Sequence, residues 1–449
     1  MVFGTTILGS NPSAPAKQMN KIFLNNNLIQ KIKKIFFPFY KSKEISEVFD
    51  ILEKDKLKEE KVAMFVGGCV RKHILGDEID DIDIATIFSP REIKEKFKNT
   101  KIEIIDTGVE HGSVTLLLNE SKFEVTTLRK DVKTDGRHAE ISFTDDWRID
   151  SERRDFTINA IYLDRRGNIF DPQLGIKDLE NKIVKFIGDP SERIKEDYLR
   201  IIRFIRFSLQ YKHNFLESST IEAIKLNLNG IKNLSKERIL KELLKIIKLS
   251  NFKNILKNED LKSIFSIIFP EFKNLNRIIK LNLIPNSDLI SLDTNTILAT
   301  LLIDESSNHE YFCHKYKVSN QIKENLDSLS KNLKEYKSDK NFFKKNLKKN
   351  IYFLGKKRIK DFALFVFFEN KKWSYQELKN LKNNIEKISI PKFPYNGKYL
   401  MKKGLVEGKK IGLALKELEE RWVKSDYHLS DKDVFAVIDK TKRLNILDI

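Results

Sequence analysis

Hydrophobic and polar positions divide the chain into a strand-like part and a helical part. Between residues 62 and 165, short runs rich in Val, Ile, Phe and Thr are separated by glycines and charged turns, a pattern typical of strands. The predicted strands are 62–66, 81–86, 101–106, 113–118, 122–128 and 159–164. This region is therefore expected to form a sheet with a few helices.

Helical periodicity flanks this region on both sides. Residues 27–60 predict one or two amphipathic helices, broken near Pro38, and helical spacing dominates after the turn-rich stretch 164–193. In 235–250, Ser235 precedes apolar residues at intervals of three and four, which predicts an N-capped helix. The apolar run "ALFVFF" at 363–368 is short and flanked by charge, so we expect it in a core.

The ends of the chain differ in composition from its middle. Residues 1–18 are rich in Gly, Ser, Pro and Ala, which predicts a disordered extension and makes Met19 an alternative to Met1 as the start. They lack the basic and apolar regions of a signal peptide. A Pro/Gly break at 393–400 predicts that a last small unit begins there.

Charge and cysteine content narrow the classes of function. The 449 residues suggest roughly three domains. A net charge of +19 favours a polyanionic partner, nucleic acid first and an anionic membrane second, although solubility in a lysine-rich proteome is an alternative. Cys69 and Cys313 show neither metal-ligand spacing nor a disulfide framework, which fits a reducing cytoplasm. No apolar run approaches the roughly 18 residues of a membrane span.

The first candidate for chemistry is the stretch "VAMFVGGCVRKHILG" at 62–76. A strand is predicted to end at Gly67 and Gly68, with a helix beginning near Cys69. Glycines allow a ligand close to the backbone, and free N–H groups at a helix start bind phosphate. Arg71 could add a charged hydrogen bond, but a plain tight turn explains the glycines equally well.

Three carboxylates form the second candidate. Asp81 and Asp83 share one face of their predicted strand, where two like charges are costly without a cation. Magnesium is typically bound by one or two carboxylates together with substrate phosphates. If strand 122–128 pairs beside them, Glu124 can complete a trio; the alternatives are a solvated D-x-D and a surface glutamate.

Two arginine-rich stretches follow. In "RRDFTINAIYLD" (153–164), Arg153, Arg154 and Asp155 fit either a structural ion pair or recognition of phosphate and ribose. In "EDYLRIIRFIRF" (196–207), charged residues recur every third position among apolar ones, and we expect one mostly buried helix. The charged residues of this row are Asp197, Arg200, Arg203 and Arg206.

The row of charges suggests a polar ligand. Buried guanidinium groups are costly without a partner. Asp197 and Arg200 together could read the amino group and adjacent acceptor that cytosine and adenine share, leaving Arg203 and Arg206 for phosphate. A salt bridge between Asp197 and Arg200 is the plainer interpretation, but it does not account for the other two arginines.

In this order and spacing, the motifs resemble the class II tRNA nucleotidyltransferase and bacterial poly(A) polymerase family. "GGCVRKHILG" with "DIDIAT", "RRDFTINA", "FDPQLGIKDL", "EDYLR" and "ERILKEL" look like the family's motifs A to E. The resemblance implies an α+β fold, with a small mixed or antiparallel-sheet head followed by an elongated all-helical neck, body and tail. The implied parts are an extension 1–18, a catalytic head 19–165, a neck 166–270, a body 271–390 and a tRNA-binding tail 391–449.

The resemblance also implies roles for single residues. Asp81 and Asp83 would bind Mg²⁺, and Glu124 would be the third catalytic carboxylate. The nucleotide-binding residues would be Gly67, Gly68, Arg71, Arg154, Asp155, Asp197, Arg200, Arg203 and Arg206. Segment 132–146 resembles the flexible loop that CCA-adding and A-adding members use to switch to ATP. Lys72 departs from the family pattern, and its role stays open.

The implied activity is addition of CCA to the 3′ end of tRNA from CTP and ATP, with release of pyrophosphate, in the cytoplasm. Stretch 106–118 resembles the tRNA-directed branch more than the poly(A) branch. Alternatives are a poly(A) polymerase, a CC-only or A-only enzyme, and a non-catalytic RNA-binding protein on the same fold. The partners expected from the resemblance are tRNA, CTP and ATP and not a membrane, and the oligomeric state stays open.

Overall fold

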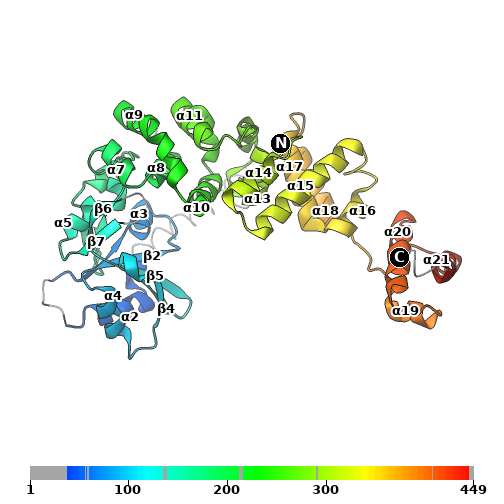
Figure 1. Ribbon diagram of the computed structural model, residues 1–449, viewed down its shortest axis with the longest axis horizontal. Helices are drawn as coiled ribbons and strands as arrows, with labels where there is room; N and C mark the ends of the chain where they lie inside the picture. Colours follow the sequence, from blue (N-terminus) through cyan, green and yellow to red (C-terminus); the bar gives the residue numbers. More distant parts are fainter. Residues whose placement is uncertain are drawn as a thin grey trace, which may run out of the picture. The chain divides into compact units, whose positions relative to one another are not determined.

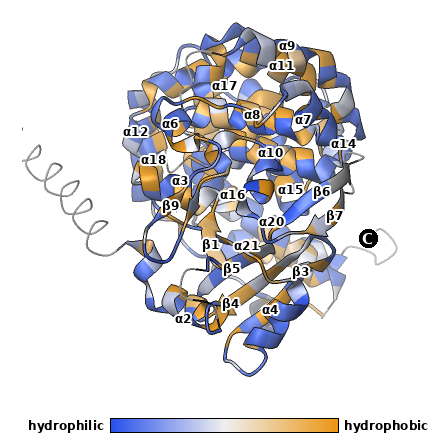
Figure 2. Ribbon diagram, turned by 90° about the vertical axis from the view of Figure 1, so that its left-hand side faces the viewer, coloured by the Kyte–Doolittle hydropathy of each residue, from blue (hydrophilic) through white to orange (hydrophobic). Residues whose placement is uncertain are grey.

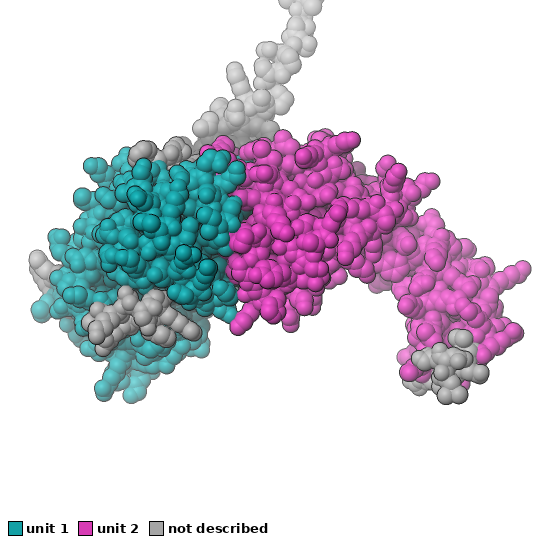
Figure 3. Space-filling model, turned by 45° about the horizontal axis from the view of Figure 1, so that its top comes forward, with its two compact units in different colours: residues 1–254, 258–268 teal, residues 255–257, 269–449 magenta. Residues whose placement is uncertain are grey.

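The computed structural model describes residues 38–55, 57, 60–134, 139–211, 216–289, 292–406 and 408–443. The predictions for extension 1–18, for Met19 and for a helix before Pro38 lie outside these ranges. Contacts divide the chain into two units, one comprising 1–254 with 258–268 and the other 255–257 with 269–449 (Figure 3). The predicted boundaries at 165, 270 and 390 remain predictions.

Unit 1 contains a seven-stranded mixed sheet with strand order β3-β4-β5-β2-β1-β8-β9. β2 and β5 are parallel, and the other neighbouring strands are antiparallel. All six predicted strands are confirmed. The strands are β1 (Ala63–Val66), β2 (Ile82–Thr86), β3 (Glu103–Gly108), β4 (Ser113–Leu118), β5 (Ser121–Thr127), β8 (Tyr162–Leu163) and β9 (Ile169–Phe170).

The two faces of this sheet carry different cores because side chains alternate along each strand. On one face, Phe65 of β1 meets Phe49 of α2 (Lys43–Leu52), with 4.7 Å between ring centroids. On the other, Met64 and Ala85 belong to a buried cluster with Tyr162. Asp83 is two residues before Ala85 and therefore shares the second face.

From residue 175 onward, helices follow the last strand of the sheet along the chain, and those of unit 1 are shown mainly in green in Figure 1. Most carry both hydrophobic and hydrophilic residues, visible as orange and blue bands on each ribbon (Figure 2). The remaining α-helices of unit 1 are α3 (Gly68–Leu75), α4 (Pro90–Phe97), α5 (Trp147–Glu152), α6 (Gly175–Glu180), α7 (Pro190–Glu196), α8 (Leu199–Gln210), α9 (Ser218–Asn227), α10 (Lys236–Ile247) and α11 (Glu259–Ile268). Ser235 caps α10 by accepting a hydrogen bond from the Arg238 amide, as predicted. The short 3-10 helices are η1 (Phe39–Lys41), η2 (Val109–His111), η3 (Thr157–Asn159), η4 (Leu228–Asn233) and η5 (Phe252–Lys257).

A hairpin occupies part of the segment that resembles a flexible loop. β6 (Arg129–Thr134) pairs with β7 (Ala139–Phe143) in a separate two-stranded sheet. The sequence did not predict these strands, because charged residues mask the alternation. Residues 135–138 lie outside the described ranges.

Unit 2 consists of helices and connecting loops, with no strand among its described residues. Its elements are η6 (Leu275–Leu283), α12 (Asn286–Leu289), α13 (Thr294–Leu302), α14 (Asn308–Tyr316), α15 (Asn320–Ser338), α16 (Leu347–Leu354), α17 (Lys356–Glu369), α18 (Tyr375–Lys387), α19 (Gly397–Lys402), α20 (Lys409–Lys424) and α21 (Asp431–Arg443). Residues 363–368 are buried in α17, as predicted. Within the described ranges, no helix has the length and apolar character needed to cross a membrane.

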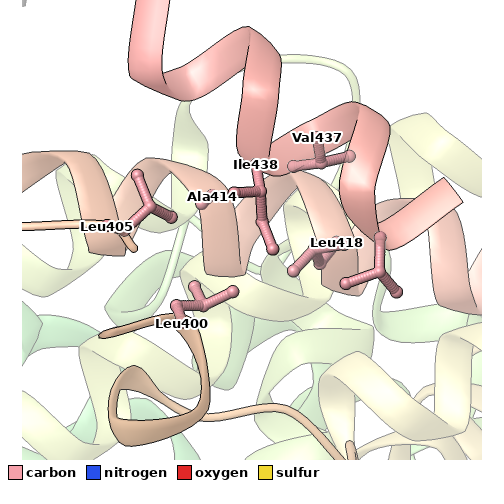
Figure 4. Packing of buried hydrophobic residues seen from close by; sticks show 7 residues of the cluster. Leu400, Leu405, Ala414, Leu418, Val437 and Ile438 are labelled. Carbon is pink, nitrogen blue, oxygen red and sulfur yellow. The ribbon is translucent and has the colours of Figure 1, made fainter. Parts of the chain in front are cut away.

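The last three helices share a hydrophobic cluster of their own (Figure 4). Leu400 of α19 and Leu418 of α20 meet Ile438 of α21, and all three side chains are almost completely buried. Phe393 and Tyr395, from the stretch before α19, pack against the same cluster. The Pro/Gly-containing stretch thus supplies aromatic contacts as well as a break.

Candidate active site

A glycine turn joins the sheet to α3. β1 ends at Val66, and α3 begins at Gly68, close to the predicted position. Gly67 has φ of 73°, which favours glycine, and a Cβ added there would lie 3.5 Å from Asp83 Oδ2. A Cβ at Gly68 would lie 3.8 Å from the same oxygen. The two glycines therefore keep the space between the helix start and the carboxylate clear.

Asp83 lies at the centre of a negatively charged group. In the parallel pairing of β2 and β5, Asp83 stands opposite Glu124, and Asp81 immediately precedes β2. Burial and then the charge of Glu124 raise the pKa of Asp83 to about 6, and Asp81 adds to the rise. A bound cation would relieve this repulsion, so the donor set fits a hard divalent metal.

Of the three predicted catalytic carboxylates, two line the cavity described below. Among the described residues, no group of three or more His, Cys, Asp or Glu side chains is placed to hold a metal. Glu124 does not line the cavity described below, whereas Asp81 and Asp83 do. In this structure, Glu124 acts on Asp83 through its charge.

Unit 1 contains a cavity of about 1000 Å³ into which these groups face. Apart from Glu124, every site residue predicted from the sequence lines it. Those residues are Gly67, Gly68, Arg71, Asp81, Asp83, Arg154, Asp155, Asp197, Arg200, Arg203 and Arg206. Residues far apart in the sequence therefore meet in one space large enough for a nucleotide.

The stretch 196–207 is not one helix, contrary to the sequence prediction. α7 ends at Glu196, Asp197 is extended with φ of −154° and ψ of 103°, and α8 begins at Leu199. Asp197 Oδ1 accepts a hydrogen bond from the Leu199 amide at 3.1 Å. An aspartate that bonds a nearby backbone amide favours such a break, which the regular spacing of charges concealed.

Asp197 and Arg200 have separate partners. Asp197 Oδ2 accepts a hydrogen bond from Arg238 of α10 at 2.7 Å. Arg200 Nη1 donates to Glu196 Oε2 at 2.6 Å and to the Arg193 carbonyl at 2.7 Å. The salt bridge between Asp197 and Arg200, the plainer alternative, is thus absent from the contacts of these two described residues, which instead pair with Arg238 and Glu196.

The other arginines of α8 are paired with buried carboxylates. Arg203 Nε donates to Asp155 Oδ2 at 2.6 Å, and Arg206 Nε donates to Glu242 Oε2 at 2.7 Å. A nucleotide is therefore not the first partner of either arginine, and their role as phosphate contacts stays a prediction. Each guanidinium has further N–H donors and still lines the cavity, so these ion pairs leave capacity for a phosphate.

A fully buried aspartate fixes the arginines that precede β8. Asp150 accepts hydrogen bonds from Arg153 Nε at 2.7 Å, from Arg154 Nη2 at 2.8 Å and from Tyr162 Oη at 2.7 Å. Burial opposes its charge, but Arg154 and Arg153 hold the pKa of Asp150 well below its usual range. The sequence interpretation missed Asp150, although its spacing of three and four residues from the arginines is a signal on a helix.

Asp155 also has protein partners. Its Oδ1 accepts hydrogen bonds from Asn159 Nδ2 at 2.6 Å and from the Phe156 amide at 2.9 Å, and its Oδ2 accepts from Arg203. Although burial acts in the opposite direction, Arg203 and Asn159 hold the pKa of Asp155 well below its usual range. Asp155 is thus an ionised link between the stretch 153–164 and α8.

Lys72 forms an ion pair with Asp80. The hydrogen bond from Lys72 is the largest cause that lowers the pKa of Asp80. Both residues line the cavity. Lys72, the position at which this chain departs from the family pattern, therefore places a positive charge beside the aspartates that line the cavity.

Comparisons with known proteins agree with this site. Residues 63–185 match the poly A polymerase head domain, and residues 215–275 match the probable RNA and SrmB-binding site of polymerase A. The sheet, the glycine turn and the paired carboxylates thus define a nucleotidyltransferase head.

Relatives that align with this chain over most of their length narrow the class of nucleotidyltransferase. Human mitochondrial CCA tRNA nucleotidyltransferase 1 is 35% identical over 417 residues, which cover 89% of this chain and 90% of the relative. The CCA-adding enzyme of Ligilactobacillus salivarius (strain UCC118) is 32% identical over 85% of this chain and 92% of the relative. The chain belongs to the CCA tRNA nucleotidyltransferase family.

Solved structures share the fold. The Bacillus stearothermophilus CCA-adding enzyme in complex with CTP has a TM-score of 0.68 at 22% identity, over 89% of this chain and 98% of that one. The Thermotoga maritima CCA-adding enzyme complexed with tRNA has a TM-score of 0.58 at 19% identity, over 90% and 97% of the two chains. The head and helical architecture is therefore that of CCA-adding enzymes.

Proposed function

We propose that the protein adds CCA to the 3′ end of tRNA, taking CTP and ATP as substrates and releasing pyrophosphate. The observation that carries this proposal is the single cavity that joins a carboxylate pair, a phosphate-compatible glycine turn and a polar Asp197–Arg200 reading edge. The family supports the choice of tRNA as substrate, because the full-length relatives are CCA-adding enzymes.

Asp81 and Asp83 would hold Mg²⁺, which when bound neutralises the triphosphate and lowers the pKa of the attacking 3′ hydroxyl. The amides at the start of α3, together with Arg71, bind phosphate oxygens. The α-phosphorus–pyrophosphate bond breaks as the tRNA 3′ oxygen forms its bond to the same phosphorus. The chain itself contributes to catalysis mainly by orienting the triphosphate and the 3′ hydroxyl toward each other.

Asp197 and Arg200 are proposed to read the base. An aspartate accepts from an exocyclic amino group, and an arginine donates to the neighbouring ring acceptor, a pattern that cytosine and adenine share. Arg154, Asp155, Arg203 and Arg206 complete the nucleotide site as residues for ribose and phosphate. Glu124 is proposed to adjust the charge of Asp83 from the neighbouring strand.

The direct test incubates the purified protein with radiolabelled CTP and ATP, separately and together. The acceptors are tRNA lacking its CCA end, tRNA ending in C or CC, and an unrelated RNA. The proposal expects CCA completion on tRNA alone, whereas A-tails on the unrelated RNA would favour a poly(A) polymerase. The Asp81→Ala variant is expected to bind tRNA without adding nucleotides, and addition by that variant would refute the metal assignment.

We further propose a cytoplasmic location. The free thiols Cys69 and Cys313 support a reducing compartment. One relative is a mitochondrial protein, so the alternative location is the mitochondrion. Imaging of the full-length protein with a C-terminal fluorescent tag tests this, and a mitochondrial signal would contradict it.

A further inference from the structure

One buried tyrosine contacts the arginine of the glycine-turn helix from behind the cavity. Tyr211 follows α8 directly, is 8% exposed, and its Oη accepts a hydrogen bond from Arg71 Nε at 2.9 Å. Arg71 lines the cavity, whereas Tyr211 is not among the described residues that do so. Tyr211 can therefore influence a ligand through Arg71, or through Phe207, whose ring it stacks against and which lines the cavity.

The ring of Phe207 forms the second support of Arg71. The guanidinium carbon of Arg71 lies 4.9 Å from the centre of this ring, and the guanidinium of Arg206 lies 4.1 Å from it. Arg203 is a third cation at 5.6 Å. The Tyr211 ring is nearly parallel to that of Phe207, with 6.1 Å between centroids. Phe207 thus attracts three like charges that would otherwise repel one another.

The charge of Arg71 is balanced differently from those of the other two. Arg203 and Arg206 each meet a carboxylate, Asp155 or Glu242. The hydrogen bonds that the structure gives Arg71 go to neutral oxygens, namely Tyr211 Oη and Asn159 Oδ1. These neutral acceptors orient the guanidinium, and its positive charge acts on Asp83 and on any anion that enters the cavity.

We propose that Tyr211 is a positioning residue that holds Arg71 ready for the phosphates of the incoming nucleotide. This inference rests on the proposed function and adds a residue to it. Because Arg71 extends from α3 and Tyr211 from the end of α8, their bond fixes the phosphate site relative to the base-reading edge. Both nucleotides carry the same triphosphate, so Tyr211 acts equally on CTP and ATP.

The test is the variant Tyr211→Phe in the full chain, which keeps the ring stack and removes one oxygen. Calorimetry with CTP and with ATP, each with Mg²⁺, should show dissociation constants raised about fivefold, the factor of one net hydrogen bond. In steady-state addition to tRNA, KM should rise by the same factor, with kcat and the CTP-to-ATP preference unchanged. Tyr316→Phe removes the same atom from a buried tyrosine of unit 2 and should leave these affinities unchanged.

A second pair of variants separates positioning from packing. Phe207→Leu and Phe204→Leu both shorten a buried aromatic of α8 that contacts the Phe156 ring. Phe207 also lies against Arg71 and lines the cavity, whereas Phe204 packs against Phe186. Both should lower the melting temperature, and Phe207→Leu alone should also weaken CTP binding.

Three results with the variants would overturn the inference. They are unchanged CTP and ATP affinity in Tyr211→Phe, an effect on only one of the two nucleotides, or equal loss of affinity in the two Phe→Leu variants. Wild-type protein that binds neither nucleotide would overturn it as well. If wild type binds CTP and Tyr211→Phe weakens that binding, but no nucleotide is added to tRNA, only the proposed function fails.

Discussion

Helices α8 and α17 are both largely buried, yet they use burial differently. α8 places Arg200, Arg203 and Arg206 among isoleucines and phenylalanines, and each arginine meets a carboxylate from another position in unit 1 or from the end of α7. α17 fills its buried positions 362–368 entirely with apolar residues. Replacing a buried ion pair by apolar residues is often neutral or stabilising, so the charges of α8 are better explained by a ligand than by stability. This comparison separates substitutions that should affect chemistry from those that should affect folding.

The largest expected effect concerns the reading edge at the start of α8. Arg200→Ala should lower CTP and ATP incorporation about 100-fold and relax discrimination against UTP and GTP, because a lost base contact removes selectivity. The melting temperature should fall as well, because Arg200 is buried and bonds Glu196 and the Arg193 carbonyl, but the loss of selectivity should be the larger effect. Single-turnover assays with all four nucleotides measure this. Arg166→Ala removes an exposed arginine outside the cavity as a control, and retained selectivity in Arg200→Ala would contradict the assignment.

The matching substitution in α17 should act on folding alone. Phe365 is completely buried, and Phe365→Ala should lower the free energy of unfolding by about 3–5 kcal/mol. Activity per folded molecule should stay at the wild-type level at temperatures below the transition. Urea unfolding and addition assays on one preparation measure both quantities. Phe435→Ala, at a 47% exposed position, serves as the control.

The third prediction asks whether α8 can be made to resemble α17. Glu242→Gln leaves the Arg206 guanidinium buried without its carboxylate and should cost about 3 kcal/mol of stability. The double variant Arg206→Met with Glu242→Leu should recover at least half of this loss, while nucleotide affinity stays reduced. A double variant with full affinity would show that this pair serves structure only.

The smallest effect expected is a pH dependence of metal binding. The pKa of Asp83 is raised to about 6, so the residue becomes protonated as the pH falls below 6. A metal ligand must be ionised, so the affinity for Mn²⁺, used as a probe, should fall about tenfold per pH unit below 6 and level off above 7. Paramagnetic relaxation of water between pH 5 and 8 measures this affinity. Asp83→Asn should bind weakly at every pH, and a flat profile in wild type would argue against Asp83 as a ligand.

Features that depend on neighbouring residues in the sequence could be predicted from it. Strands such as β1 and β2 and helices such as α10 were predictable because apolar periodicity and a serine cap are local signals. The residues of the cavity were predictable from motifs, since Gly67, Asp83 and Arg200 stand in recognisable patterns.

Other features were beyond local reasoning. The pairings of Arg203 with Asp155 and of Arg206 with Glu242 join residues 48 and 36 positions apart. Nothing in the spacing of charges selects such partners, because the fold brings them together. The break at Asp197 was hidden for a different reason, since a backbone hydrogen bond from Leu199 overrides an otherwise helical pattern.

That break has a mechanical consequence. In a continuous helix, residues 197 and 200 would keep one fixed offset, which suits a base of one size. Here Asp197 is tied to α10 through Arg238, whereas Arg200 is tied to the end of α7 through Glu196. A pyrimidine and a purine present the same hydrogen-bonding pattern at different reach from the ribose. If Asp197 and Arg200 read the base as proposed, small shifts of α7 and α10 would change the distance between the two side chains and let bases of both sizes fit.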